Sequence, residues 1–203
     1  DTPHNLGVML GHEYYDSRVA YLTASKSKMF SDTNLELGGA VVDGKNAYSS
    51  KDRYNNEGFF GRVQYDYDNR YYGSASYRRD ASSRFHPDNR WGNFWSAGAG
   101  WNILNEEFMK SIKKKIDLMK LRFSMGYTGQ VSFSPFQAMT MYQYLNTYEY
   151  KNGIGAVPLT IGDVDLAWER TMNYNIGFDF SMFDRRLNFV LDAYVRKTTD
   201  LLL

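Results

Sequence analysis

Hydrophobic and polar residues alternate along several stretches of this chain. In residues 119–128 every second side chain is apolar, from Met119 to Tyr127, and the residues between them, from Lys120 to Thr128, are polar or glycine. Side chains on a β-strand point alternately to its two faces. The pattern therefore predicts a strand with one apolar and one polar face.

The same alternation occurs in pairs of stretches joined by short polar turns, which predicts antiparallel hairpins. In the first hairpin, strands at 61–67 and 71–78 are joined by a turn at 68–70. In the second, strands at 172–180 and 187–196 are joined by a turn at 181–185. Further strands are expected at 94–103 and, with weaker alternation, at 5–15. With the strand at 119–128, the count is about seven.

The connections between these strands are unequal in length. Those at 68–70 and 181–185 are tight, and residues 104–117 have room for a short helix. Long loops rich in Gly, Ser, Asn and Tyr are predicted at 16–57, 79–93 and 129–167. When the chain reversals are counted, every long connection except 104–117 falls at one end of the strands. Long loops on one rim and tight turns on the other are typical of outer-membrane β-barrels.

The aromatic residues of the predicted strands gather near the strand ends. The chain has 17 Tyr, 13 Phe and 4 Trp but only 4 Pro, a balance that favours strands. Tyr67 and Tyr71 flank one tight turn, whereas Trp91 and Trp95 lie on the long-loop side. Amphipathic rings prefer the two boundaries of a membrane, so the pattern predicts two girdles. A soluble β-sandwich with an aromatic core, acting as a carbohydrate-binding module, is the alternative that the pattern leaves open.

Composition removes several other classes of protein. With no cysteine, the chain has neither a disulfide scaffold nor a thiolate metal site. A net charge of +1 gives no electrostatic case for nucleic acid. The chain contains no run of 18 apolar residues, so it predicts no membrane-spanning helix. The first residues lack the pattern of a secretory signal.

Candidate chemical groups are few. His4, His12 and His86 lack zinc-ligand spacing, and Asp163 and Asp165 lack the glycine and the further ligands of a calcium loop. The sequence therefore predicts no catalytic residue, no metal site and no cofactor, and favours a protein that is not an enzyme.

The loop predicted at 129–167 holds the one candidate binding site. Tyrosines recur there among amide side chains, at Tyr142, Tyr144, Tyr148 and Tyr150. Aromatic faces beside amides suit stacking on sugar rings or on peptide side chains. The alternative is a loop that packs on its own tyrosines.

Four segments of the chain carry distinctive motifs. Residues 58–85 begin GFFGRVQYDYDNRY and end YRRDASSRF, and residues 90–101 read RWGNFWSAGAGW. Residues 118–130 read LMKLRFSMGYTGQ, and residues 165–203 contain DLAWERT, NIGFDF and the final TTDLLL. These four segments resemble stretches of the SusC/RagA family of TonB-dependent transporters, and their order and spacing match as well.

The resemblance implies a fold, a location and partners. It implies an all-β, antiparallel transmembrane β-barrel of about 22 strands, with long extracellular loops and short periplasmic turns. About seven strands cannot close such a barrel, so residues 1–203 are expected to be one partial barrel domain, with the plug domain and the TonB-contacting segment elsewhere. The family further implies the outer membrane of a Gram-negative bacterium, membrane lipid around the wall and glycan or peptide cargo. The implied partners are a SusD-like surface lipoprotein and the TonB–ExbB–ExbD system.

Overall fold

The fold is taken from a computed structural model of residues 1–203. It describes residues 2–29, 31–33, 36–113, 115–133, 136–150 and 153–200. Within these ranges, the side chains at 39, 41, 43–46, 145–150 and 153–154 lie outside the description.

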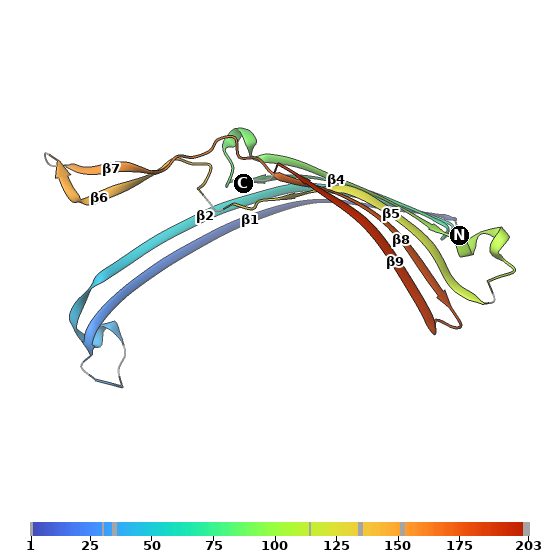
Figure 1. Ribbon diagram of the computed structural model, residues 1–203, viewed down its shortest axis with the longest axis horizontal. Helices are drawn as coiled ribbons and strands as arrows, with labels where there is room; N and C mark the ends of the chain where they lie inside the picture. The colour runs from blue at the N-terminus through green and yellow to red at the C-terminus, as the bar shows by residue number, and fades with distance from the viewer. Residues whose placement is uncertain are drawn as a thin grey trace. The chain divides into compact units, whose positions relative to one another are not determined.

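The described residues form nine β-strands, seven of which make one antiparallel sheet (Figure 1). The sheet has the order β1-β2-β3-β4-β5-β8-β9. Each strand of the sheet therefore lies beside the strand that follows it in the sheet along the chain. Its strands are β1 His4–Met29, β2 Ala40–Tyr67, β3 Tyr71–Ser82, β4 Trp91–Asn102, β5 Ile116–Gln130, β8 Glu169–Met182 and β9 Leu187–Thr199. A separate two-stranded sheet consists of β6 Met141–Tyr150 and β7 Gly153–Thr160.

The remaining regular structure is short. Four 3₁₀ turns lie at η1 Leu37–Gly39, η2 Pro87–Asn89, η3 Ile103–Asn105 and η4 Glu107–Met109. The part of the chain that the structure describes has no helix of the length and hydrophobicity needed to cross a bilayer.

The chain divides into two compact units. One comprises residues 1–14 with 56–203, and the other is the hairpin arm of residues 15–55, formed by the far halves of β1 and β2. Within the arm, the carboxylate of Asp16 accepts hydrogen bonds of 3.1 and 3.2 Å from Arg53. The rings of Tyr21 and Tyr48 lie 6.3 Å apart across the same pair of strands. Cross-strand polar and aromatic pairs therefore hold this arm together.

The strand register brings residues of like character onto one face. Ala75 on β3 pairs with Ala97 on β4, which pairs with Met125 on β5. Met125 pairs with Tyr174 on β8, which pairs with Val195 on β9. Because directly paired residues point to the same side of a sheet, the alternation seen in single strands becomes one continuous apolar face. The alternation predicted at 119–128 is confirmed, because these residues of β5 pair with β8 in an unbroken register.

The two tight turns lie where the sequence predicts them. Asp68 and Asn69 have φ of 52° and 51° between β2 and β3, a left-handed conformation that Asp and Asn adopt with little strain. Phe183, Asp184 and Arg185 also have positive φ, in the turn between β8 and β9.

The predicted loops need correction. Residues 16–57 are not a long loop, because β1 continues to Met29 and β2 already begins at Ala40. The connection predicted at 79–93 shortens to 83–90, and that at 129–167 contains the hairpin β6–β7. The far halves of β1 and β2 were missed because they show no sustained apolar period. In β7 the residues Gly153, Gly155 and Pro158 count against a strand when the sequence is considered alone. The described residues of 104–117, which had room for a short helix, contain only the single turns η3 and η4.

Candidate functional site

Two short aromatic rows lie on the apolar face of strands β3 and β4. In the lower row Tyr71 on β3 pairs with Trp101 on β4, and in the upper row Tyr77 pairs with Trp95. The paired positions between the two rows hold small or aliphatic side chains, such as Ala75. Six residues of strand separate the rows on β3, a span of roughly 20 Å. This arrangement matches an apolar membrane band edged by two aromatic girdles.

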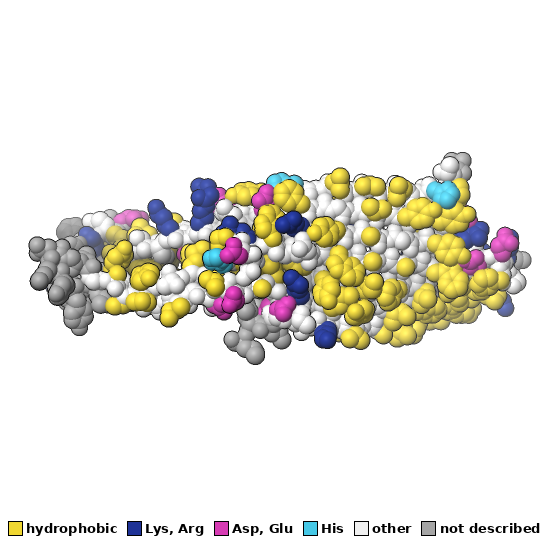
Figure 2. Space-filling model, turned by 90° about the horizontal axis from the view of Figure 1, so that it is seen from above, with side chains coloured by type: hydrophobic (Ala, Val, Ile, Leu, Met, Phe, Trp, Pro, Cys, Tyr) yellow, Lys and Arg dark blue, Asp and Glu magenta, His cyan; other side chains and the backbone are white. Residues whose placement is uncertain are grey.

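Nothing in the described structure covers this face. Phe123 on β5 and Ile176 on β8 pair with each other in the middle of the band, yet they are 45% and 50% exposed. Figure 2 shows the face as a broad patch of hydrophobic side chains. A β-sandwich would bury these side chains between two sheets, so the soluble carbohydrate-binding module is not the fold of this chain.

The opposite face is polar and charged. Arg122 on β5 donates hydrogen bonds of 2.8 Å to both carboxylate oxygens of Asp179 on β8 and one of 3.1 Å to Asp192 on β9. The ammonium group of Lys120 lies 4.2 Å above the ring centre of Tyr72. These contacts join side chains of β3, β5, β8 and β9, so they favour the register that also aligns the apolar face.

A groove of about 670 Å³ runs over this polar face. Its lining includes polar side chains of β2, β3, β5 and β8, among them Gln64, Ser74, Ser124 and Asn175. A wall with such a surface suits contact with water or with polar molecules, as the lumen face of a barrel does.

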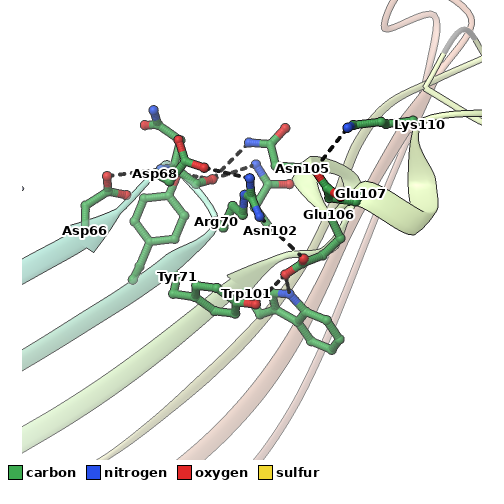
Figure 3. Close-up of polar contacts among 12 residues, drawn as sticks. Asp66, Asp68, Arg70, Tyr71, Trp101, Asn102, Asn105, Glu106, Glu107 and Lys110 are labelled. Carbon is green, nitrogen blue, oxygen red and sulfur yellow. Dashed lines mark hydrogen bonds and ion pairs between the residues drawn. The ribbon is translucent and has the colours of Figure 1, made fainter. Parts of the chain in front are cut away.

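A carboxylate joins the tight turn at 68–70 to the following connection (Figure 3). Glu106 Oε1 accepts hydrogen bonds of 2.6 Å from the Tyr71 hydroxyl and 2.9 Å from Trp101 Nε1. Arg70 lies 3.9 Å from its other oxygen. The hydrogen bond from Tyr71, followed by that from Trp101, lowers the pKa of Glu106 below its usual value.

The backbone of the same turn is also held. The carbonyl oxygen of Asn69 accepts hydrogen bonds of 3.3 Å from Asn102 Nδ2 and 2.9 Å from Asn105 Nδ2. The turn and the connection at 103–115 therefore form one polar rim beside the lower aromatic row.

At the other end of the sheet, the connections at 83–90 and 131–168 share a small core. Phe85 has no exposed surface, and its ring lies 4.9 Å from the rings of both Phe133 and Trp168. Ala138 and Leu166 complete the buried cluster. Trp168 Nε1 donates a 3.1 Å hydrogen bond to the carbonyl oxygen of Arg90. Two connections more than 40 residues apart are thus packed into one structure on the rim.

The predicted binding tyrosines all lie on β6. Tyr142 and Tyr144 are 63% and 69% exposed, so neither ring is packed within the described structure. Tyr148 and Tyr150 lie on the same strand, but their side chains are outside the described residues. The structure therefore leaves two of the four rings free on the surface of the hairpin and does not test whether they bind a ligand.

The histidines stay apart from one another. His4 hydrogen-bonds to the Tyr65 hydroxyl at 2.7 Å, and His12 lies 3.1 Å from Glu57. Among the described residues, no group of three or more His, Cys, Asp or Glu is arranged to hold a metal ion. Neither Glu106 nor the Phe85 cluster was singled out from the sequence, since their partners are distant along the chain.

Comparison with known proteins agrees with this geometry. The model of the family described as TonB dependent receptor-like, beta-barrel, matches residues 1–203. The chain is 43% identical over 143 residues to a TonB-dependent receptor of Formosa agariphila. The aligned region covers 70% of this chain and 14% of that protein. It is 39% identical over 150 residues to the TonB-dependent receptor SusC of Bacteroides thetaiotaomicron, covering 71% of this chain and 15% of SusC.

Solved structures give the same result. A structure of the RagAB peptide transporter superposes with a TM-score of 0.89 at 29% identity, covering 100% of this chain and 22% of that one. The chain thus spans less than a quarter of the length of each of these relatives. The family is one of transporters rather than enzymes, and its barrels lie in the outer membrane. This chain therefore belongs to the TonB-dependent receptor family, of the SusC/RagA type, and forms part of the wall of its β-barrel.

Proposed function

We propose that the protein containing this segment imports glycans or peptides across the outer membrane, driven through TonB. The observation that carries the proposal is the two-faced wall. Its apolar face, with Phe123 and Ile176 exposed, suits lipid, whereas the face that carries Arg122 and the 670 Å³ groove suits a polar passage. In this proposal residues 1–203 are one part of the barrel domain, and the energy-coupling system acts on another part of the receptor.

Peptide cargo and a surface partner are supported by the relatives. The matching solved structures are of RagAB, which is named a peptide importer and is seen in closed-closed and open-open states. We assign this receptor a SusD-like surface lipoprotein as its partner and the TonB–ExbB–ExbD system as its source of energy. Glycans remain the second cargo class, because the resemblance to SusC/RagA proteins implies both.

Cargo or the partner is proposed to meet the receptor at the hairpin β6–β7. The hairpin belongs to the connection 131–168, on the rim opposite the tight turns. Long connections of such barrels face the cell exterior. Tyr142 and Tyr144 expose their rings there, and Tyr148 and Tyr150 lie further along the same strand. Exposed rings contribute to binding when they stack on a flat or apolar group of a ligand.

Uptake by whole cells tests this function. The full-length receptor would carry Tyr142→Ala with Tyr144→Ala, and the matched control would carry Phe at both positions. We expect the alanine pair to reduce uptake of labelled peptides or oligosaccharides, or capture of the lipoprotein, with unchanged receptor abundance. The phenylalanine pair keeps both ring faces, so its uptake should stay close to that of the parent.

Two results would count against the proposal. Uptake that persists in cells lacking TonB would remove the energy-coupled mechanism. If uptake and lipoprotein capture were equal in the parent and the alanine pair, β6 would not be the contact for cargo or the lipoprotein. That result would not contradict TonB-driven import.

A further inference from the structure

The apolar face contains a groove between β1, β2 and β3. Its volume is about 1010 Å³, and all of its lining residues belong to the unit formed by residues 1–14 and 56–203. The side chains that define it are Leu10, Phe59, Gly61, Ala75, Tyr77 and Arg79. Since this face is the one that contacts lipid, the groove opens into the bilayer and not into the lumen.

Small residues make the floor of this groove. Gly61 on β2 pairs with Tyr77 on β3, and Val63 pairs with Ala75. A Cβ atom added to Gly61 would lie 3.1 Å from Cδ2 of Leu10, so the absent side chain lets Leu10 lie close to β2. Tyr77 is 51% exposed and Leu10 is 83% exposed. Both side chains therefore project beyond the floor and form the sides of the groove.

Two consecutive arginines of β3 differ in their partners. Arg78, on the polar face, forms ion pairs of 2.8 Å with Glu13 and 2.6 Å with Asp80. Arg79 is exposed on the apolar face, and its guanidinium carbon lies 4.9 Å from the ring centre of Trp91. Within the described residues no carboxylate pairs with Arg79. Its positive charge is therefore available to an anion from outside the chain.

Arg79 lies at the height of the lipid headgroups. It follows Tyr77 by two residues, which places it roughly 7 Å beyond the upper aromatic row. An exposed cation at this level costs far less than one in the middle of the bilayer. The rim on this side carries the long connections, which face the cell exterior, so the adjacent leaflet is the outer one.

We propose that the groove binds one phosphorylated glycolipid of the outer leaflet. One acyl chain lies over Gly61 and Ala75, and the phosphate pairs with Arg79. From Arg79 to Ala75 the strand spans roughly 13 Å, a length that an extended acyl chain can follow. The planar guanidinium donates two parallel hydrogen bonds to a phosphate. A neutral lipid would leave the unpaired Arg79 without an anion, which is why the charged lipid is favoured.

The experiment uses the full-length receptor, purified in detergent, with lipid A as the probe. Bound lipid is counted by native mass spectrometry over a titration. Ala75→Leu fills the floor and Arg79→Gln removes the charge. Ala97→Leu is the matched control for the first, because Ala97 pairs with Ala75 on the same apolar row but does not line the groove. Lys197→Gln on β9 is the control for the second, an exposed cation far along the sheet from Arg79.

We expect one lipid A on the parent receptor and dissociation constants about tenfold higher for Ala75→Leu and Arg79→Gln. The two controls should stay within about twofold of the parent. Each variant would first be checked for the compact electrophoretic migration of a folded barrel, and Ala75→Val would replace Ala75→Leu if that variant failed to fold. Equal affinity of the parent and both groove variants would overturn the site. Equal binding of dephosphorylated lipid A or of phosphatidylglycerol would overturn the choice of a phosphorylated glycolipid.

Discussion

Glu106 and Tyr71 are joined by a 2.6 Å hydrogen bond that ties the connection 103–115 to the first residue of β3. The same carboxylate oxygen accepts a hydrogen bond from the indole of Trp101. Tyr71 and Trp101 pair across β3 and β4 in the lower aromatic row. One side chain of the rim therefore fixes the polar ends of two rings that mark the edge of the apolar band.

Loss of this carboxylate should destabilise the rim. We expect Glu106→Ala to be less stable than Glu106→Gln, because the Gln carbonyl oxygen still accepts a hydrogen bond whereas Ala leaves both ring donors without their partner. Unfolding of the full-length receptor in liposomes, followed by urea titration, measures the order. A Glu106→Ala receptor as stable as the parent would show that the two rings need no anchor.

The same contact predicts a pH dependence. Because the pKa of Glu106 is lowered in the folded state, its contribution to stability is present above the unfolded value of 4.5 and is lost as the pH falls through the folded value. The parent should thus lose stability below about pH 4.5 more steeply than Glu106→Gln, which cannot titrate at this position. Parallel curves for the two receptors between pH 6 and pH 3 would contradict this role for Glu106.

The two faces of β5 should respond differently to charge. Phe123 lies on the lipid face, paired with Ile176, whereas the next residue, Ser124, lies on the opposite face, paired with Asn175. Phe123→Arg should cost about 2–4 kcal/mol of unfolding free energy, and Ser124→Arg much less, because the lumen is hydrated. The same urea titration measures both. Equal costs would mean that the two sides of the wall have not been assigned correctly.

The rim core predicts a local effect of mutation. Phe85→Ala removes a fully buried ring that contacts Phe133 and Trp168, at an expected cost of about 3–5 kcal/mol. Because the cluster joins two connections, their protection from hydrogen exchange should fall while that of β4 and β5 is retained. Phe183→Ala, at an exposed turn position, serves as the control and should leave both connections protected.

The membrane-spanning strands could be predicted because each crosses from one boundary to the other with a different solvent on each face. In β5, apolar residues alternate with polar residues or glycine at every position from Met119 to Thr128. The far halves of β1 and β2 could not be found in this way, because they show no sustained apolar alternation. In β6 the tyrosines do alternate with other residues, but they were interpreted as a binding loop and not as a strand. Pro158 lies inside β7 and counts against a strand when the sequence is considered alone.

The contacts that organise the rims depend on residues distant along the chain. Phe85 and Leu166 share one core although 80 residues separate them, and no local pattern pairs them. For Arg79, the contrast with Arg78 becomes informative only once the register shows which face each one occupies.

The orientation of the wall is tested most directly by labelling in intact cells. Residues 1–203 contain no cysteine. With any cysteine elsewhere in the receptor replaced by serine, a single one can be placed at Ile161, in the connection 131–168, or at Phe108, in the connection 103–115. Both positions are well exposed, at 86% and 66%. With a membrane-impermeant maleimide on full-length receptor, we predict that Ile161→Cys is labelled in intact cells and Phe108→Cys only after the outer membrane is permeabilised. Labelling of Phe108→Cys in intact cells, with Ile161→Cys protected, would contradict the account.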